Sequence, residues 1–454
     1  MRVLYLFLAF AISLITAQPT FQNSSGTRLR VDNGTYGPPV EEVHYFYDQW
    51  PVGFAVSSKG RIFVTYYPGN YTYTLGEVVN ETTERPYPSQ EWNVPPDERT
   101  QNVDGILFGS NNHTGLISVQ ALYITPQTDR RPETLWVLDV GRPNVGPTGE
   151  MAYALPGELL RFFLPFPEAE IHYFNAPSMR EADRGSTGGT KLVAINLDND
   201  TVADVYTFPS TVNYPDSSLN DLRFDLRPNA TESGKGIVYF SDESPEGRNG
   251  VVMLDLGTGE SWRQLDLHPS TRGAYDVVPS YQGVPFYQWA KGSPFKHLTQ
   301  GCDGIQLDPS GSVLYYSPMV SDYIYSIETK YLRDHTSIDS LEAANDNVKS
   351  LGQRGGHGNG FEGDSNGLIY QGIPEQNAIY YYNPSTRRTE PFVRDPRIIW
   401  PDGLSIGEDG YLYVIINQLP YQPMWNNGTD FRQYPGAILR AKLPNGGTKI
   451  TSLY

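Results

Sequence analysis

Cysteine is almost absent from this sequence of 454 residues. Cys302 is the only one, so no disulfide can form within the chain. After the N-terminus, no segment approaches the run of about 18 apolar residues that a transmembrane helix needs. Helical periodicity is also scarce, and Ser340–Ser350 is the main helical candidate. No HExxH motif or paired-histidine spacing indicates a zinc site. Packing and hydrogen bonds therefore have to hold the fold together.

Basic residues are in deficit, with 34 Lys and Arg against 51 Asp and Glu, which gives a formal net charge of −17. This charge argues against nucleic acid or an anionic membrane as a partner. We expect a monomer that binds a small molecule.

The N-terminal segment has the pattern of a secretory signal peptide. Arg2 precedes an apolar run from Val3 to Ile15, and the small residue Ala17 ends it. We therefore expect an extracellular protein with a signal peptide at 1–17, a glycosylated extension at 18–44 and a folded domain at 45–454. N-glycosylation sequons support the same compartment. They start at Asn23, Asn33, Asn70, Asn80, Asn112, Asn199, Asn229 and Asn427.

One hairpin pattern is repeated along the chain. DGIQLDPSGSVLYY at Asp303–Tyr316 and DGLSIGEDGYLYV at Asp402–Val414 both start with Asp-Gly and join two alternating segments by a turn. Further first strands are expected at Gly53–Val56, Val119–Ile124 and Asp221–Leu226, and near Gly363-Asp364. Six units of three or four strands predict an all-β fold, a six-bladed β-propeller of antiparallel four-stranded blades. The long insertions at 66–101 and 141–189 are either binding loops or surface decoration.

The Asp-Gly positions would then surround one mouth of the central channel, because inner strands of a propeller line that channel. Asparagine and aspartate side chains would converge there as ligand-binding groups: Asn220, Asp221, Asp303, Asp364 and Asp402. Their oxygens also suit Ca²⁺, with Asn220 and Asp303 as metal ligands if the ion is present. The alternative is structural, since Asp and Asn before Gly satisfy backbone groups at tight turns.

Several longer strings resemble the secreted major royal jelly protein and Yellow family, in order along the mature chain. They include LWVLDVGRP at Leu135–Pro143, LNDLRFD at Leu219–Asp225, GVVMLDLGTGESWRQL at Gly250–Leu265 and WPDGLSIGEDGYLYVIINQL at Trp400–Leu419. The resemblance implies a six-bladed propeller that binds small aromatic or amine molecules in its central cavity. It also implies dopachrome-type conversion in some members. Insect members carry several cysteines that this chain lacks, so we expect a fungal-type member acting in secondary or pigment metabolism.

Several other residues are candidates for the site, and each also has an ordinary structural interpretation. His357, in the glycine-rich stretch Arg354–Asp364, is a candidate acid–base group. His297 and Trp400 precede expected inner strands and are candidate ligand contacts. Ser405 matches G-x-S-x-G but lies inside an expected strand, so we reject it as a nucleophile. Cys302 is expected to be a buried packing residue. Loop aromatic residues could wall a cavity for a planar ligand: Trp92, Trp289, Trp400, Tyr421 and Trp425.

Three functions remain open from sequence. The first is binding of a small aromatic or amine metabolite, with isomerisation, tautomerisation or cyclisation catalysed by Asp303, Asp402 or His357 and no cofactor. The second is binding without catalysis. The third is a Ca²⁺-dependent lactonase, in which the ion would polarise an ester carbonyl.

Overall fold

The computed structural model describes most of the chain from residue 32 onward. The described ranges are 32–66, 73–93, 101–103, 106–108, 115–116, 118–141, 144–145, 150–151, 190–209, 211–214 and 216–454. The predicted signal peptide and much of both insertions lie outside these ranges, as do the sequons at Asn23, Asn70 and Asn112.

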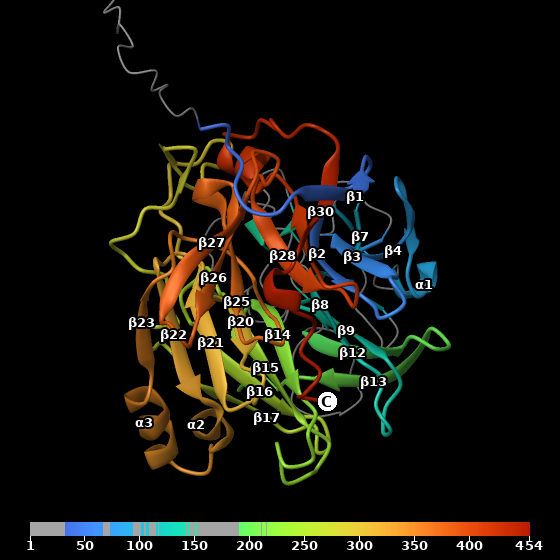
Figure 1. Cartoon of the computed structure of the whole chain (residues 1–454), viewed down its shortest axis with the longest axis vertical. Helices are drawn as coiled ribbons and strands as arrows, with labels where there is room; N and C mark the ends of the chain where they lie inside the picture. The colour runs from blue at the N-terminus through green and yellow to red at the C-terminus, as the bar shows by residue number, and fades with distance from the viewer. Residues whose placement is uncertain are drawn as a thin grey trace, which may run out of the picture. The chain divides into compact units, whose positions relative to one another are not determined.

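Within the described residues, the strands form six antiparallel four-stranded sheets, which are the blades of a β-propeller (Figure 1). Blade 1 contains β2 (Pro51–Val56), β3 (Ile62–Tyr66), β4 (Leu75–Asn80) and β5 (Thr83–Pro86). Blade 2 contains β8 (Val119–Thr125), β9 (Thr134–Asp139), β12 (Lys191–Asn196) and β13 (Thr201–Thr207). Blade 3 contains β14 (Leu219–Asp225), β15 (Ile237–Asp242), β16 (Gly250–Asp255) and β17 (Ser261–Gln264). Blade 4 contains β20 (Cys302–Leu307), β21 (Val313–Pro318), β22 (Tyr323–Glu328) and β23 (Lys349–Gln353). Blade 5 contains β24 (Phe361–Gly363), β25 (Ile369–Ile373), β26 (Ala378–Asn383) and β27 (Arg388–Arg394).

Blade 6 joins the two ends of the propeller. It contains β28 (Pro401–Ile406), β29 (Tyr411–Ile416), β30 (Gly436–Lys442) and, as its outermost strand, β1 (Val40–Phe46). Strand β1 pairs antiparallel with β30, with Val40 opposite Ala441. This pairing closes the ring and leaves only short strand edges, as a propeller requires. The predicted fold class is confirmed, and the propeller already includes residues before the expected boundary at residue 45.

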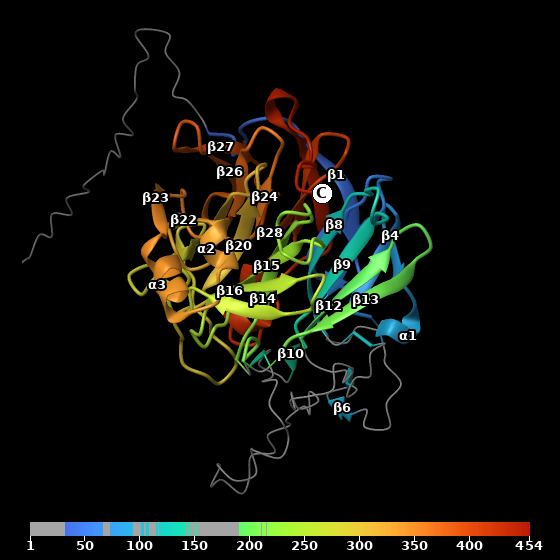
Figure 2. The same cartoon turned by 90° about the horizontal axis from the view of Figure 1, so that it is seen from below.

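The remaining elements are short and lie between or outside the blades. The two-stranded pairs are β6 (Gln101–Val103) with β7 (Ile106–Phe108), β10 (Asn144–Val145) with β11 (Glu150–Met151), and β18 (Ser280–Tyr281) with β19 (Val284–Pro285). The α-helices are α1 (Gln90–Asn93), α2 (Thr329–Arg333) and α3 (Ile338–Asp346). Single 3-10 turns are η2 (Pro374–Gln376), η3 (Leu419–Tyr421), η4 (Pro423–Trp425) and η5 (Pro444–Gly446). Helix α3 confirms the helical candidate, and it lies with α2 at the outer edge of blade 4 (Figures 1 and 2).

The inner strands β2, β8, β14, β20, β24 and β28 adjoin one another around a central axis. Where Asp-Gly begins an inner strand, the pairing with the second strand contains a β-bulge. Cys302 is opposite Pro318, but Ile305 is opposite Tyr316, so Asp303 and Gly304 occupy the bulge. Equivalent shifts occur near the start of β2, β8, β14 and β28. Bulges of this kind redirect side chains, often next to functional sites.

Glycine after the bulged residue allows neighbouring inner strands to approach closely. A Cβ atom on Gly304 would lie 2.5 Å from Cδ1 of Phe361, and one on Gly360 would lie 2.8 Å from the backbone oxygen of Asp402. Both contacts are shorter than carbon atoms tolerate. The Asp-Gly pattern therefore combines a redirected polar side chain with a close approach between blades.

A cluster of buried hydrophobic side chains lies between each pair of neighbouring blades. Between blades 3 and 4, for example, Tyr239 and Met253 pack with Ile305 and Leu314. The single cysteine, Cys302, is fully buried in the same cluster, as expected. Its burial and the neighbouring Asp303 raise the pKa of its thiol, which disfavours the nucleophilic thiolate. The ring is thus closed by apolar packing and strand pairing.

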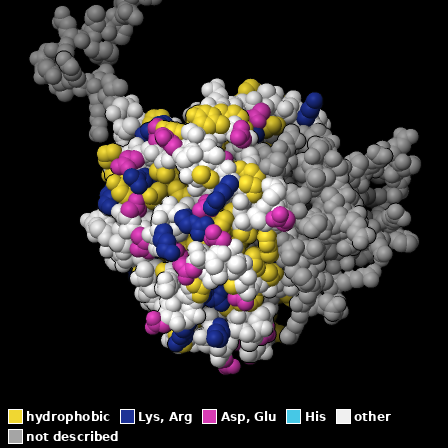
Figure 3. Space-filling view, turned by 90° about the vertical axis from the view of Figure 1, so that its right-hand side faces the viewer, with side chains coloured by type: hydrophobic (Ala, Val, Ile, Leu, Met, Phe, Trp, Pro, Cys, Tyr) yellow, Lys and Arg dark blue, Asp and Glu magenta, His cyan; other side chains and the backbone are white. Residues whose placement is uncertain are grey.

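On the face seen in Figure 3, acidic and basic side chains of the described residues are interspersed and do not gather into a patch of one sign. Among the residues that the structure describes, no helix is both long enough and apolar enough to cross a bilayer.

Candidate functional site

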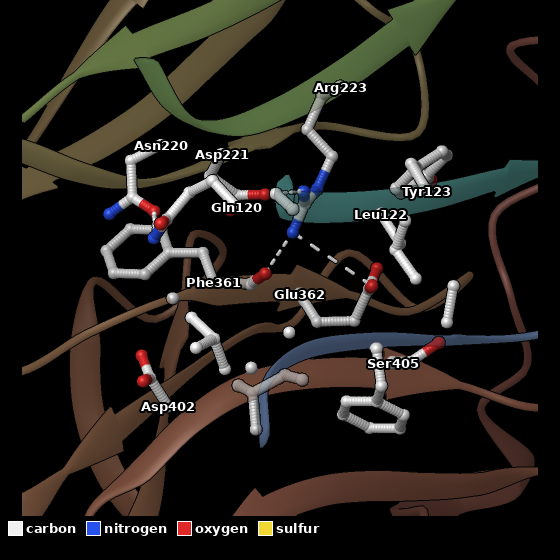
Figure 4. A pocket seen from close by; sticks show the side chains of 18 of the residues that line it. Gln120, Leu122, Tyr123, Asn220, Asp221, Arg223, Phe361, Glu362, Asp402 and Ser405 are labelled. Atoms are coloured by element: carbon white, nitrogen blue, oxygen red, sulfur yellow. Dashed lines mark hydrogen bonds and ion pairs between the residues drawn. The ribbon is translucent and has the colours of Figure 1, made fainter. Parts of the chain in front are cut away.

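The starts of the inner strands form a ring of polar side chains, which we call the mouth ring. Blades 2, 3, 4 and 6 each contribute one amide or carboxyl group to it, at the position that precedes or occupies the bulge, and blade 5 contributes Asn359, which precedes β24 and bonds to Asp402. The members are Gln120, Asn220, Asp303, Asn359 and Asp402. In blade 1 the corresponding residue is Val52. Gln120, Asn220 and Asp402 lie around one end of the cavity in Figure 4.

Hydrogen bonds link the mouth-ring side chains from blade to blade. Gln120 Nε2 donates to Asn220 Oδ1 at 2.8 Å, and Asn220 Nδ2 donates to Asp303 Oδ1 at 2.9 Å. Asn220 Nδ2 also donates to Glu243 Oε2 at 3.1 Å. In this arrangement the Asn220 NH₂ group faces both carboxyl groups, and the Asn220 amide oxygen faces Gln120. That orientation in turn fixes the amide of Gln120.

Asp402 forms a second linked group on the other side of the ring. Its Oδ1 accepts a hydrogen bond from Asn359 Nδ2 at 2.8 Å, and its Oδ2 accepts one from Asn417 Nδ2 at 2.6 Å. These bonds point the amide nitrogen of Asn359 toward Asp402, so the amide oxygen of Asn359 faces elsewhere.

The groups that remain open in the mouth ring are acceptors. Gln120 Oε1 and Asn359 Oδ1 are buried and accept no hydrogen bond from any described residue. A buried oxygen without a donor is costly, by about 1–3 kcal/mol. The amide donors of the ring, by contrast, are engaged with neighbouring oxygens. A ligand that completes this ring must therefore bring hydrogen-bond donors.

The environment of the carboxyl groups in the ring disfavours their ionised forms. Burial, followed by the negative charges of Glu243 and Asp402, raises the pKa of Asp303 well above its ordinary value. Burial also raises the pKa of Asp402, to about 6, although hydrogen bonds from Asn359 and Asn417 act to lower it. A positive charge placed between these carboxyl groups would stabilise their ionised forms.

A second layer of side chains lies deeper in the channel, three residues after each mouth-ring residue. The bulge adds one residue to the usual strand period of two, so the side chain at the third position again faces the channel. The members of this inner layer that line the cavity are Ala55, Tyr123, Arg223, Glu362 and Ser405, and Gln306 joins them through its hydrogen bond from Arg223.

Arg223 crosses the inner layer from blade 3 toward blades 4 and 5 (Figure 4). Its guanidinium donates to Asp221 Oδ1 at 2.6 Å, to Gln306 Oε1 and to the backbone oxygen of Phe361. Its Nη2 lies 4.0 Å from Glu362 Oε2. Arg223 is therefore fully engaged with the protein and braces three blades across the channel.

The far end of the channel is covered by the C-terminal segment. Tyr454 and Tyr123 share a hydrogen bond of 2.7 Å between their hydroxyl groups. The ammonium of Lys449 lies 5.5 Å from the centre of the Tyr123 ring. Asn220 and Asp402 of the mouth ring are partly exposed, whereas Gln120, Asp303, Asn359 and the inner layer are buried. Solvent therefore enters at the mouth ring.

The cavity between these layers is narrow, offering about 50 Å³ to the centres of water-sized molecules. One water centre needs about 10–15 Å³, so the space holds on the order of four waters. It has room for an ammonium or a short alkyl group. A larger ligand body would have to remain at the mouth.

The structure brings together four of the residues predicted from sequence: Asn220, Asp221, Asp303 and Asp402 line the same cavity. The expectation that Asp364 begins an inner strand is wrong. Asp364 follows β24, and its carboxylate accepts hydrogen bonds from the backbone of Asn366 and Leu368, both at 3.0 Å. It therefore caps the turn at the opposite end of the blade from the mouth ring.

The two candidate histidines lie outside the set of residues that line the cavity. His357 is fully buried, with Nδ1 3.3 Å from Glu375 Oε1. Burial acts to raise the pKa of Glu375, but its interactions with His357 outweigh this and lower it. His297 is half-buried and forms a hydrogen bond of 2.9 Å with the backbone oxygen of Val277.

The loop aromatic residues expected to wall the cavity lie elsewhere. Trp400 is fully buried and packs against Phe286, which also contacts Trp425. The backbone of Trp400 has φ +61°, a left-handed conformation that turns its side chain into this separate cluster. The aromatic residues that do line the cavity are Phe54, Phe361 and Tyr123. Trp92, Trp289 and Tyr421 are also absent from its lining.

Ser405 lies within β28, where its hydroxyl accepts a hydrogen bond from the backbone of Val56 at 3.3 Å. This placement agrees with its rejection as a nucleophile. The calcium alternative stays a prediction; in the arrangement seen here, the Asn220 amide turns its nitrogen, not its oxygen, toward Asp303. Among the described residues, no group of three or more His, Cys, Asp or Glu side chains is arranged to hold a metal ion.

Sequence reasoning missed two members of the mouth ring. Asn359 precedes Gly360, and this pair corresponds to the Asp-Gly pairs of blades 4 and 6. Because blade 5 has asparagine where those blades have aspartate, the Asp-Gly pattern did not identify it. Gln120 lacks a following glycine and carried no comparable signal. Lys449 was also not predicted as a cavity residue, because no local sequence pattern indicates that the C-terminal segment crosses the channel.

Residues 182–449 match the family described as Major royal jelly protein. Protein yellow of Drosophila erecta and Protein yellow of Drosophila melanogaster are each 24% identical to the chain over 262 residues, covering 54% of this chain and 44% of the relative. The match thus spans less than half the length of these relatives.

Solved structures whose backbone follows a similar path have lower sequence identity to this chain. A luciferin-regenerating enzyme has a TM-score of 0.46 at 10% identity, covering 91% of this chain and 97% of its own. A gluconolactonase from Xanthomonas campestris has a TM-score of 0.41 at 11% identity, covering 92% of this chain and 100% of its own. Likeness at this level carries no information about function.

Proposed function

The chain belongs to the major royal jelly protein family, and from that premise we propose that its central channel binds a small organic amine, aromatic or aliphatic. The ammonium group enters the mouth ring, and the body of the ligand stays at the opening. The family resemblance expected from the sequence is confirmed, whereas the ligand is our proposal.

The observation that carries this proposal is the hydrogen-bond polarity of the mouth ring. Its amide donors are directed at neighbouring oxygens, which leaves Gln120 Oε1 without a donor in the lining of the cavity, beside two carboxyl groups. An ammonium supplies three donors and no acceptor. It therefore complements this ring, whereas an anion or a neutral acceptor would face only oxygens.

Electrostatics favours the same ligand. Asp303 and Asp402 are both held with raised pKa values because burial disfavours their charged forms. A bound cation compensates for that penalty, and hydrogen bonds between charged groups contribute about 1.5–3 kcal/mol each. Phe54 and Phe361 line the cavity and can contact the apolar part of the ligand.

The proposal is tested by calorimetric titration with tyramine and with 4-ethylphenol, which has the same aromatic ring but no ammonium. We expect tyramine to bind at one equivalent and 4-ethylphenol to bind at least about tenfold more weakly, because it leaves the acceptors without donors. Equal affinity of the two compounds, or binding of neither, would contradict the proposal.

A second candidate function is catalysis of a proton relocation such as isomerisation, tautomerisation or cyclisation. It is favoured by the raised pKa of Asp402, about 6, because a general base works best when its pKa lies near the ambient pH. Asp303, whose pKa is raised well above its ordinary value mainly by burial, would supply the acid. The test is conversion of dopachrome followed by absorbance. Wild-type protein should accelerate it and the Asp402→Asn variant should not. No acceleration by the wild type would leave a binding protein.

We also propose that the protein is a secreted glycoprotein. The sequon asparagines in the described part of the chain have exposed side chains: Asn33, Asn80, Asn199, Asn229 and Asn427. An oligosaccharide can therefore be attached to each without disturbing the core. Expression in a secreting eukaryotic host should yield protein in the medium whose mass falls on treatment with an N-glycosidase. Retention in the cells without glycan would contradict this.

A further inference from the structure

Lys449 occupies an unusual position for a lysine. It follows η5 in the C-terminal segment, and its backbone pairs with that of Asp364 in an isolated bridge. Its side chain lines the central cavity and has only 8% of its surface exposed. Lysines are almost never buried to this degree without a partner.

The ammonium of Lys449 has no such partner among the described residues, with which it forms neither an ion pair nor a hydrogen bond. The Lys449 ammonium lies over the face of the Tyr123 ring, 5.5 Å from the ring centre. Burial lowers the pKa of Lys449, although the negative charge of Glu362 acts to raise it. The neutral amine is therefore more accessible here than on a surface lysine.

Lys442 provides a comparison within the same chain. Its ammonium also lies over a tyrosine ring, 4.6 Å from the centre of Tyr411. However, Lys442 is exposed and donates a hydrogen bond of 2.6 Å to the backbone oxygen of Asp409. The two lysines share an aromatic contact and differ in burial and in the presence of an acceptor. They form a matched pair for testing reactivity.

We propose that Lys449 is a nucleophilic amine that captures small aldehydes or ketones as imines at the inner end of the channel. The nitrogen lone pair attacks the carbonyl carbon and forms a carbinolamine. The two hydrogens of the neutral amine and the carbonyl oxygen then leave as one water molecule, and a C=N bond remains. No oxidant or reductant is needed. This proposal does not rest on amine binding at the mouth ring, although both ligands would use the same cavity.

The neighbouring phenols suit such a step. Tyr123 and Tyr454 share a hydrogen bond, and burial raises the pKa of both hydroxyl groups. They therefore stay protonated at neutral pH and can donate to the oxygen of the carbinolamine as it leaves. The narrow cavity selects small carbonyl compounds, since it holds on the order of four waters.

The test uses the full-length protein with propionaldehyde and sodium cyanoborohydride at neutral pH, followed by peptide mapping by mass spectrometry. Cyanoborohydride delivers hydride to the imine carbon and so fixes each imine as a propyl-lysine. We expect Lys449 to be propylated several-fold faster than Lys442, and its rate to level off at a lower pH. A rate at Lys449 equal to or below that at Lys442 would overturn the proposal.

A bulky aldehyde tests the role of the channel. 1-Naphthaldehyde should modify exposed Lys442 but not Lys449, because the cavity cannot admit its two fused rings. Equal modification of both lysines by 1-naphthaldehyde would show that Lys449 is reached from open solvent, and would overturn its place at a confined site. The Lys449→Arg variant should lose the fast phase of propylation, and its other lysines should react as in the wild type. The main comparison is the ratio of the propylation rates of Lys449 and Lys442 in the wild-type protein. The test therefore does not depend on folding of the variant.

Discussion

Replacing Asp303 by asparagine is the sharpest perturbation of the mouth ring. The substitution keeps the size of the side chain and leaves an oxygen that can accept from Asn220 Nδ2, as Asp303 Oδ1 does at 2.9 Å. It removes the carboxylate that would receive the ligand ammonium. A hydrogen bond between charged groups contributes about 1.5–3 kcal/mol, and about 1.4 kcal/mol corresponds to a tenfold change in affinity. We therefore expect tyramine to bind about ten- to a hundredfold more weakly to the Asp303→Asn variant.

Stability should respond in the opposite way. Burial and the negative charges of Glu243 and Asp402 disfavour the ionised form of Asp303, so an uncharged amide removes a penalty from the folded state. The melting temperature of Asp303→Asn at neutral pH should equal or exceed that of the wild type. Loss of affinity together with retained stability distinguishes a binding residue from a structural one.

The assay is isothermal titration calorimetry with tyramine, and the matched control is Asp276→Asn. Asp276 is exposed in the loop before blade 4, so its substitution changes the net charge equally but leaves the mouth ring intact. The control should bind tyramine within about twofold of the wild type, as expected for a screened surface charge. Equal affinity of Asp303→Asn and wild type would refute the reasoning.

Three further predictions concern pH, the inner layer and metal. The folded-state pKa of Asp402 is raised from 3.8 to about 6, so the stability that it contributes is present below pH 4 and is lost as pH rises through 6. The free energy of unfolding of the wild type relative to Asp402→Asn should fall by about 2.4 kcal/mol between pH 4 and 7, and a flat difference in chemical denaturation would contradict this. Arg223→Met leaves Asp221 and Glu362 without their cation and should cost about 3–5 kcal/mol in the same assay; a loss below about 1 kcal/mol would mean that the brace is dispensable. EDTA should change neither the melting temperature nor tyramine binding, whereas a fall reversed by Ca²⁺ would restore the lactonase alternative.

The sequence predicted the propeller because its inner strands repeat a recognisable pattern. Asp303-Gly304 and Asp402-Gly403 each place a polar residue and a glycine in a bulge, and the alternation that follows is that of a strand. Asn220, Asp303 and Asp402 could therefore be placed at one mouth without coordinates. The same logic failed for Asp364, because the repeat in blade 5 starts at Asn359 and not at an acid.

Other features depend on contacts between distant segments, which local patterns do not encode. Trp400 lies two residues before Asp402, yet its left-handed backbone turns the indole toward Phe286. Arg223 reaches from blade 3 to the backbone of blade 5, and Lys449 enters the cavity from the C-terminal segment. The direction of the amide groups in the mouth ring was likewise fixed only by their neighbours.

The most direct test of the central claim is a crystal structure of the protein soaked with tyramine. We predict density for the ligand at the mouth ring, with its ammonium within hydrogen-bond distance of Asp303 or Asp402 and of the open oxygen on Gln120. Density with the phenol in the ring and the ammonium in solvent would contradict the account, as would a mouth ring without ligand at saturating tyramine.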